Sequence, residues 1–181
     1  LGWHNQTPIW FFKENFEDNF EAPWASRETM LARLEWYIKN VLTFVQTEYP
    51  GVIYAWDVVN EAVSDGRGTY RNGDENSTWW KVYGSNEFII NAFRFANKYA
   101  PADVELYYND YNEWVSSKVD GIVQLLKDVK NAEGTRIDGM GMQAHHKMST
   151  PSVEEVEAAV RAYCEVVGKV QWTELDINAS G

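Results

Sequence analysis

Short apolar runs with the composition of strands alternate along this chain with longer stretches of helical period. Such alternation predicts repeated β/α units around a parallel sheet. The runs are apolar almost without interruption, which suits strands that are covered on both faces. We expect strands at residues 52–59, 104–108, 139–143 and 170–175, and the end of another strand at residues 1–4.

Four helices are expected between these strands, because apolar residues there recur at spacings of three and four. The first helix begins near Ser26 and stops at Pro50. The fourth begins with Ser152 and Glu155, which fit a capping box, and stops at Gly168. The second and third helices occupy residues 88–96 and 119–129.

The number of strands limits how much of a barrel this chain can form. A complete eight-stranded barrel takes about 250 residues, whereas this chain has 181 residues. We therefore expect an α/β fold, a (β/α)8 TIM barrel that is incomplete in this chain, with about five strands and four helices. Residues 1–181 are expected to form the central part of one barrel, without a second domain. Because an isolated piece would expose unpaired apolar edges, we expect another segment or chain to supply the missing strands.

Charge and composition exclude several classes of partner. The 16 basic and 27 acidic side chains give a net charge of −11, which would repel nucleic acid. No apolar run approaches the roughly 20 residues of a membrane-spanning helix, and the opening residues lack the features of a secretory signal.

Nine Trp and ten Tyr suit either stacking on sugar rings or a bulky core. The sole cysteine, Cys164, is expected to be a small buried residue of the fourth helix.

Polar residues gather where the predicted strands end. In a β/α barrel the carboxyl ends of all strands meet at one rim, so these residues would share one cleft. The alternative is that each polar group is satisfied separately within the structure. The clusters are residues 3–4, Asn60 with Glu61, Asn109 with Asp110, Gln143 with His145, and Glu174 with Asp176.

Glu61 and Glu174 are the candidate pair for glycoside hydrolysis. This reaction needs one protonated carboxyl group that helps the leaving oxygen depart, and one ionised carboxylate that attacks the sugar or activates water. Each glutamate follows an apolar strand, whose low-dielectric surroundings can push the two pKa values apart. A single glutamate at a strand end is usually a solvated loop residue, whereas two with amide or imidazole neighbours indicate a site.

Five segments resemble, in chain order, successive motifs of the family 10 glycoside hydrolases, chiefly endo-xylanases. Together they span nearly the whole chain, with spacing similar to that of the family. The resemblance implies that these segments are barrel strands three to seven. The motifs are WHNQTP at residues 3–8, WDVVNEA at 56–62, YNDYN at 108–112, GMQAH at 141–145 and TELDI at 173–177.

The resemblance implies a role for each candidate residue. Glu61 would be the general acid/base and Glu174 the nucleophile of a retaining enzyme, with carboxyl groups roughly 5 to 5.5 Å apart. His145 and Asp176 would orient the nucleophile and keep it ionised. Asn60 would bond to the sugar 2-hydroxyl, unless it only caps the next helix. Sugar contacts are implied for Trp3, Gln6 and Tyr111, for which a structural role is the alternative, and support of the two carboxyl groups for Asn109 and Gln143.

Some features of the family fall outside this chain. A sugar-binding histidine four residues before Trp3 would precede Leu1, and strands one, two and eight are absent. No cofactor and no metal are expected. Neighbouring strand residues alternate faces, so His145 and His146 cannot both point into the cleft, and a metal-dependent hydrolase is the weakest alternative.

The sequence therefore predicts hydrolysis of internal β-1,4-xylosidic bonds in xylan or xylo-oligosaccharides by a retaining double-displacement mechanism. The alternative is a non-catalytic fragment that binds xylan or its oligosaccharides without complete subsites. The resemblance also implies a secreted, cell-surface or periplasmic protein. From the charge and the short apolar runs, neither nucleic acid nor a membrane is expected as a partner.

Overall fold

The computed structural model describes residues 7–75 and 77–179. Its main sheet has the strand order β1-β2-β3-β5, and every neighbouring pair of strands is parallel. This arrangement confirms the predicted β/α units, while the strand expected at residues 1–4 lies outside the described residues. The strands are β1 (Ala55–Asn60), β2 (Glu105–Asp110), β3 (Gly139–Met142) and β5 (Lys169–Trp172).

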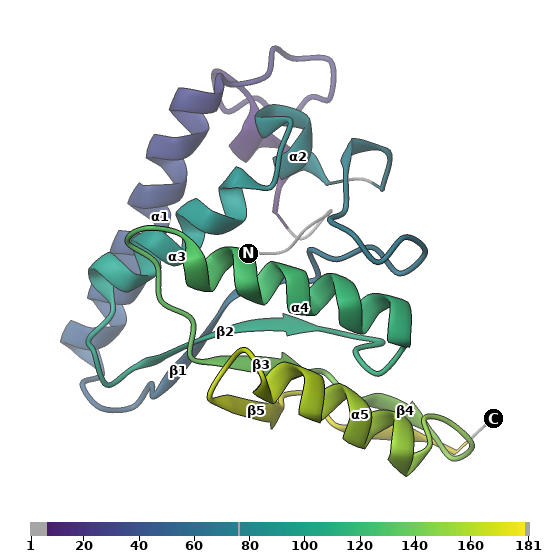
Figure 1. Ribbon diagram of the computed structural model, residues 1–181. Coiled ribbons are helices and arrows are strands. Elements are labelled where there is room, and N and C mark those ends of the chain that lie inside the picture. Colours follow the sequence, from purple (N-terminus) through teal and green to yellow (C-terminus); the bar gives the residue numbers. More distant parts are fainter. Residues whose placement is uncertain (1–6, 76, 180–181) are drawn as a thin grey trace.

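Long helices connect these strands and lie along the sheet (Figure 1). Helix α3 packs against β1 and β2, α5 packs against β5, and α1 lies against α3. All four predicted helices are present: α1 (Arg27–Glu48), α3 (Glu87–Tyr99), α4 (Ser116–Asn131) and α5 (Val153–Cys164). The structure adds the short helices η1 (Ile9–Phe12), η2 (Gly73–Glu75) and α2 (Thr78–Tyr83).

Side-chain caps fix the starts of two helices as the sequence predicts. The Ser26 side chain accepts a hydrogen bond from a backbone N–H in the first turn of α1. At the start of α5, Ser152 and Glu155 form both bonds of a capping box. Each cap satisfies donors that the helix itself leaves unpaired, so these short motifs locate helix starts reliably.

The end of α5 differs from the prediction. The helix stops at Cys164 rather than at Gly168, because the chain turns there to bury both Val166 and Val167 before β5 begins. The expectation of a buried cysteine is also wrong, since Cys164 is exposed. Its neighbour Tyr163, which is fully buried, takes the inward position of that turn.

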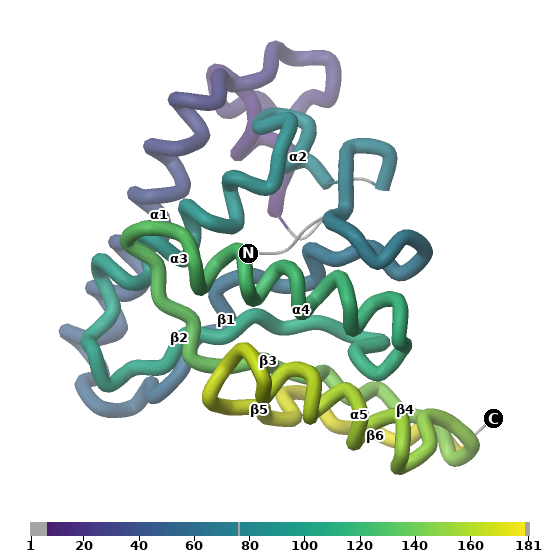
Figure 2. The backbone as a smooth tube through the Cα atoms, in the orientation of Figure 1, coloured from purple at the N-terminus to yellow at the C-terminus, as the bar shows by residue number. Residues whose placement is uncertain are grey.

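Two predicted strands end earlier than expected, at Met142 instead of residue 143 and at Trp172 instead of residue 175. Each is followed by a short strand that was not predicted, and these two short strands form a second, parallel sheet. The chain runs on from β3 and β5 into this sheet (Figure 2), which sets His145 opposite Asp176. Its strands are β4 (His145–Lys147) and β6 (Asp176–Asn178).

The main sheet is curved like a segment of a barrel wall. Its two edge strands, β1 and β5, line a common cavity of about 270 Å³, with Asp57 on one side and Trp172 on the other. No further strand pairs with either edge within residues 7–75 and 77–179. The chain thus forms an incomplete barrel, as the strand count predicts. Its core lies between sheet and helices and includes Phe93, Leu106, Ile122, Leu126 and Met140, all fully buried.

Candidate active site

Glu61 follows the last residue of β1 in an unusual backbone conformation. Its φ of 55° lies in the left-handed region, which a residue with a side chain rarely adopts. The Glu61 N–H donates to the Asn109 carbonyl at 2.9 Å, and the Glu61 carbonyl accepts from Arg71 Nε at 3.0 Å. Strain of this kind persists where the surrounding structure enforces it and gathers at functional sites.

A chain of side-chain amides joins the two candidate carboxyl groups. Gln143 Nε2 donates to Glu61 Oε1 at 2.9 Å and to Asn60 Oδ1 at 3.2 Å. Asn109 Nδ2 donates to the same Asn60 oxygen at 3.0 Å and to Glu174 Oε1 at 3.0 Å. Glu61 and Glu174 therefore lie at the same end of the sheet, on opposite sides of three linked amides.

Parallel pairing brings these residues together. Asn60 at the end of β1 pairs with Asn109 of β2, which in turn pairs with Gly141 of β3. Gln143 directly follows β3, and its N–H donates to the carbonyl of Asp110 at 3.0 Å. The aligned carboxyl ends of the strands thus set the spacing of the site.

Thr173 and Gly141 fix the Asn109 amide, although sequence reasoning assigned neither a role. Thr173 Oγ1 donates to Asn109 Oδ1 at 2.7 Å, which turns the amide nitrogen toward Glu174. A Cβ atom at Gly141 would lie 2.7 Å from Asn109 Oδ1 and 2.9 Å from Thr173 Cγ2. Only glycine leaves the asparagine side chain in its place.

His145 links the second carboxyl group to an aspartate. Its Nδ1 lies 2.9 Å from Asp176 Oδ2, and its Nε2 lies 3.2 Å from Glu174 Oε2. The β4–β6 pairing holds the histidine and Asp176 side by side. Burial acts to lower the pKa of His145, but the hydrogen bonds and negative charges of Asp176 and Glu174 outweigh burial, so its pKa is raised above 6.5.

His146 faces the other way, toward a carboxyl group that the sequence did not single out. Its Nε2 lies 3.8 Å from Oε1 of Glu113, which is fully buried. The same Glu113 oxygen accepts from the Ala144 N–H at 3.2 Å, and this helps hold Ala144 at a φ of 58° between Gln143 and His145. Glu113 therefore shapes the backbone bend that carries both neighbouring site residues.

The two adjacent histidines should titrate in opposite directions. Burial lowers the pKa of His146, whereas the carboxylates around His145 raise its pKa. We expect NMR titration of the ring protons, assigned with His145→Asn, to give a pKa above about 6.5 for His145 and below it for His146. Because its pKa is raised in the folded state, protonation of His145 stabilises the fold. This contribution is fully present below the ordinary pKa of about 6.5 and is lost as the pH rises through the raised pKa. The reverse order of the two pKa values would contradict the geometry.

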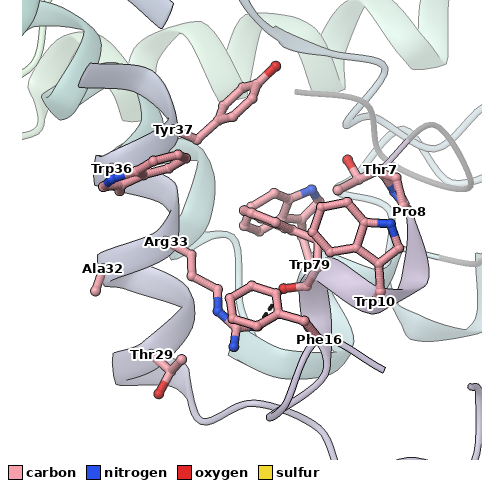
Figure 3. Close-up of a pocket in the computed structure, with 11 residues that line it drawn as sticks. Thr7, Pro8, Trp10, Phe16, Thr29, Ala32, Arg33, Trp36, Tyr37 and Trp79 are labelled. Carbon is pink, nitrogen blue, oxygen red and sulfur yellow. Dashed lines mark hydrogen bonds between the residues drawn. The ribbon is translucent and has the colours of Figure 1, made fainter. Parts of the chain in front are cut away.

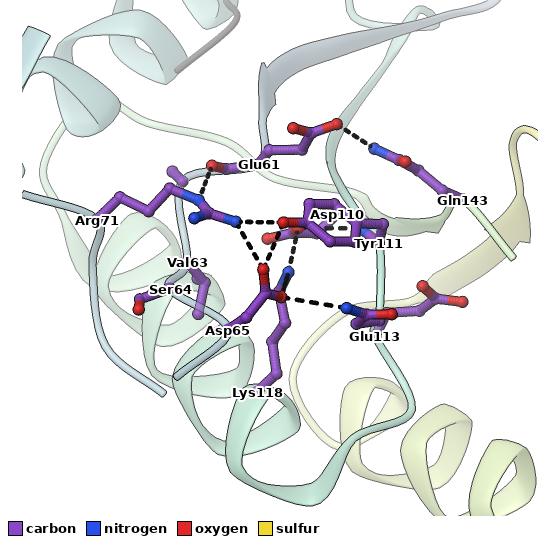
Figure 4. A network of polar contacts seen from close by, with 12 residues as sticks. Glu61, Val63, Ser64, Asp65, Arg71, Asp110, Tyr111, Glu113, Lys118 and Gln143 are labelled. Carbon is purple, nitrogen blue, oxygen red and sulfur yellow. Dashed lines mark hydrogen bonds and ion pairs between the residues drawn. The ribbon is translucent and has the colours of Figure 1, made fainter. Parts of the chain in front are cut away.

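Tyr111 lies within a polar network beside Glu61 (Figure 4). Its hydroxyl accepts from Arg71 Nη2 at 2.8 Å and donates to Asp65. Burial, with the hydrogen bond to Asp65, raises the pKa of Tyr111 to about 12. The hydroxyl is thus engaged within the protein, and contact of Tyr111 with a sugar stays a prediction. Trp3 and Gln6 lie outside the described residues.

A large cavity lies apart from these carboxyl groups. It has a volume of about 1020 Å³ and opens between residues 7–16 and α1 (Figure 3). Aromatic side chains form most of its wall, and neither Glu61 nor Glu174 lines it. Within residues 7–75 and 77–179, no group of three or more His, Cys, Asp or Glu side chains is arranged to hold a metal ion.

A curved wall of parallel β/α units with two carboxyl groups at one rim has the architecture of the barrel glycoside hydrolases. Sequence comparison agrees with this class. The chain belongs to glycosyl hydrolase family 10, whose sequence model matches residues 1–181. The predicted family resemblance is thereby confirmed.

Two relatives are much longer than this chain. It is 44% identical over 191 residues to endo-1,4-beta-xylanase Y of Acetivibrio thermocellus, covering 98% of this chain and 17% of that protein. It is 47% identical over 178 residues to endo-1,4-beta-xylanase B of Butyrivibrio fibrisolvens, covering 98% of this chain and 26% of that protein. The chain therefore spans well under half the length of either relative.

Solved structures match the fold closely. The CBM22-1 and GH10 modules of the Clostridium thermocellum endo-1,4-beta-D-xylanase 10B, complexed with xylohexaose, match with a TM-score of 0.88 and 44% identity over 98% of this chain and 36% of that one. The intracellular xylanase of Thermoanaerobacterium saccharolyticum matches with a TM-score of 0.86 and 35% identity, over 99% of this chain and 53% of that one.

Proposed function

We propose that residues 1–181 are the central part of a catalytic barrel that hydrolyses internal β-1,4-xylosidic bonds in xylan and xylo-oligosaccharides with retention of configuration. The observation that carries this proposal is the hydrogen-bonded path from Glu61 through Gln143, Asn60 and Asn109 to Glu174. Family membership and the xylanases among the relatives support the choice of substrate.

In the proposed reaction Glu61 and Glu174 act in two steps. Glu61 protonates the departing sugar oxygen while Glu174 attacks the anomeric carbon, which gives a covalent glycosyl-enzyme. Glu61 then removes a proton from the water that releases the sugar. No cofactor takes part, because each step moves only a proton or an electron pair between sugar, water and the two carboxyl groups.

The neighbouring residues support these steps. His145, bonded to Asp176, lies against Glu174 Oε2 and orients its carboxylate for the attack. The Asn60 oxygen already accepts two amide donors. We therefore propose that Asn60 Nδ2 donates to the sugar 2-hydroxyl.

The stereochemistry of the first product tests the mechanism. We use "complete barrel" for this chain together with the missing strands, however these are supplied. NMR of xylo-oligosaccharide hydrolysis by the complete barrel should give the β-anomer of the new reducing end first, because two inversions restore the configuration. Initial formation of the α-anomer would contradict a glycosyl-enzyme on Glu174.

Gly141→Ala should lower activity through Asn109. The added methyl group overlaps the Asn109 and Thr173 side chains, so the amide that supports Glu174 must move. We expect kcat/KM on xylotetraose to fall by up to about 100-fold, the cost of a displacement near 1 Å at a catalytic group. Gly168→Ala is the matched control, because its Cβ would meet only one atom, at an ordinary distance of 3.9 Å. Equal activities of the two variants would contradict this role of Gly141.

The alternative is a fragment that binds sugar without cleaving it. The share of the matched structures that this chain covers, 36% and 53%, favours this alternative for the chain on its own. Binding energy from distant sugars supports turnover, so missing subsites would lower kcat as well as affinity. Binding of xylohexaose by the chain on its own, with no shorter product released, would favour this alternative for the isolated chain.

We propose that another segment or chain supplies the missing strands. Support comes from exposed aromatic side chains: Trp36 is 65% exposed beside the large cavity, and Tyr54 and Trp172 are 71% and 55% exposed near the sheet edges. Surfaces of this kind usually pack against another element. The isolated chain should therefore aggregate or self-associate in size-exclusion chromatography. A monodisperse, cooperatively melting monomer would contradict the proposal.

We propose a secreted, cell-surface or periplasmic location, because xylan is a polymer found outside the cytoplasm. One matched structure is nevertheless that of an intracellular xylanase, so the proposal rests on the location of the substrate. Among the described residues, no helix is long and apolar enough to cross a membrane. Fractionation of the source organism, followed by immunodetection, tests the location; signal only in the cytoplasm would contradict it.

A further inference from the structure

Lys118 is a fully buried lysine that bridges two carboxylates beneath the candidate site. It lies in the first turn of α4, and its Nζ is 2.6 Å from Asp65 Oδ1 and 2.9 Å from Asp110 Oδ1. The ammonium also lies 3.7 Å from the centre of the Tyr111 ring. Lysine is seldom fully buried unless it is paired. Here the pairing joins the loop after β1 to the end of β2.

One path of contacts leads from Lys118 to the carbonyl of Glu61 (Figure 4). Asp65, held by Lys118 through one oxygen, accepts from Arg71 Nη2 at 3.2 Å through the other. Arg71 Nε then donates to the Glu61 carbonyl at 3.0 Å. The guanidinium is thus fixed at both ends, and it restrains the peptide group that follows Glu61.

A second path reaches the two N–H groups after Glu61. Asp110, held by Lys118, accepts a hydrogen bond from the Tyr108 hydroxyl. That hydroxyl accepts from the Ala62 N–H at 2.8 Å and from the Val63 N–H at 3.1 Å. Both aspartates therefore connect the same ammonium group to the backbone around Glu61.

Helix α4 also supports this loop by direct backbone contact. A Cβ atom at Gly121 would lie 2.4 Å from the Gly68 carbonyl oxygen, and one at Gly68 would lie 2.3 Å from that of Ser117. The loop that begins at Glu61 therefore rests on the first turns of the helix that carries Lys118. A left-handed Glu61 needs such support, because its backbone is strained on its own.

We propose that Lys118 is a positioning residue for the acid/base Glu61. By holding Asp65 and Asp110 together, it fixes the peptide groups on the carboxyl side of Glu61 and so the direction of its side chain. This inference rests on the proposed function. A purely structural ion pair would hold the fold together without directing the Glu61 side chain, and such a pair can often be replaced as a whole by well-packed apolar residues.

Two substrates distinguish a misplaced general acid from a general loss of active-site structure. Cleavage of xylotetraose needs protonation of the leaving oxygen, whereas 2,4-dinitrophenyl β-xylobioside carries a leaving group that departs without it. In the complete barrel, Lys118→Met should lower kcat/KM on xylotetraose by about 10- to 100-fold, as expected for a misplaced catalytic group. The kcat/KM on the dinitrophenyl substrate, which reports only the first step, should stay within about threefold.

Lys98→Met is the matched control, because Lys98 makes the same kind of ion pair, to Glu35, on the surface. Lys98→Met should leave kcat/KM unchanged on both substrates. If Lys118→Met lowers kcat/KM equally on both substrates, or on neither, the positioning role of Lys118 is overturned while the proposed function stands. A wild-type barrel that cleaves neither substrate would overturn the proposed function and the inference with it.

Asp65→Asn decides the matter if Lys118→Met does not fold. Asp65 is 38% exposed at its side chain and keeps its shape as asparagine, so this variant weakens one of the two paths without burying an unpaired charge. It should show a smaller loss with the same preference for the dinitrophenyl substrate. An equal change on both substrates would overturn the inference.

Discussion

Replacing Glu174 with glutamine in the complete barrel should abolish xylan hydrolysis. The amide keeps the shape of the side chain and an oxygen that can accept from Asn109, but it cannot attack the anomeric carbon. We expect kcat to fall on the order of 10⁴-fold or more, as when the nucleophile of a covalent mechanism is removed. Reducing-sugar release from xylan measures this loss.

Glu165→Gln makes the same chemical change at an exposed position at the end of α5. It should retain normal activity and normal thermal unfolding. Near-normal xylan hydrolysis by Glu174→Gln would end the assignment of Glu174 as nucleophile. If circular dichroism shows that Glu174→Gln does not fold, covalent trapping of the wild-type barrel, described below, tests the assignment instead.

Glu61→Ala should produce a loss that depends on the leaving group. Without its acid, the complete barrel should lose about 10²- to 10⁴-fold in kcat/KM on xylotetraose, the usual contribution of general acid catalysis. On 2,4-dinitrophenyl β-xylobioside kcat/KM should change little, because dinitrophenolate departs unprotonated. Its kcat should still fall, since the second step needs Glu61 as a base.

Equal losses in kcat/KM on the two substrates would contradict the acid role of Glu61. Glu133→Gln offers the control, because Glu133 is exposed after the end of α4. It should leave both kinetic constants unchanged on both substrates. The Glu61 and Lys118 variants should show the same substrate preference, with the larger effect at Glu61.

Local signals predicted most of the fold. The capping box at Ser152 and the apolar spacing of α1 located helices to within a few residues, because these features act over one or two turns. The end of α5 was missed, since burial of Val166 and Val167 depends on distant packing. The short strands β4 and β6 were not predicted. The break before β4 falls at Ala144, whose left-handed conformation is supported by Glu113 from beyond the end of β2.

The candidate site was predictable only in part. Motifs at the strand ends named Glu61, Glu174 and their amide neighbours, because parallel strands carry such residues to a common rim. Lys118, Thr173 and Glu113 were not identified, although each contacts the site or its support. Lys118 lies in a helix whose composition looks ordinary, and only the fold brings it between Asp65 and Asp110. Long-range pairing of this kind leaves no local pattern in a single sequence.

Covalent trapping tests most directly whether Glu174 is the nucleophile of a retaining active site. The complete barrel is incubated with 2,4-dinitrophenyl 2-deoxy-2-fluoro-β-xylobioside, and its peptides are then mapped by mass spectrometry. Stoichiometric labelling of Glu174, absent in Glu174→Gln, is the result expected. Attachment to a different residue, or an active barrel that the reagent never labels, would contradict it.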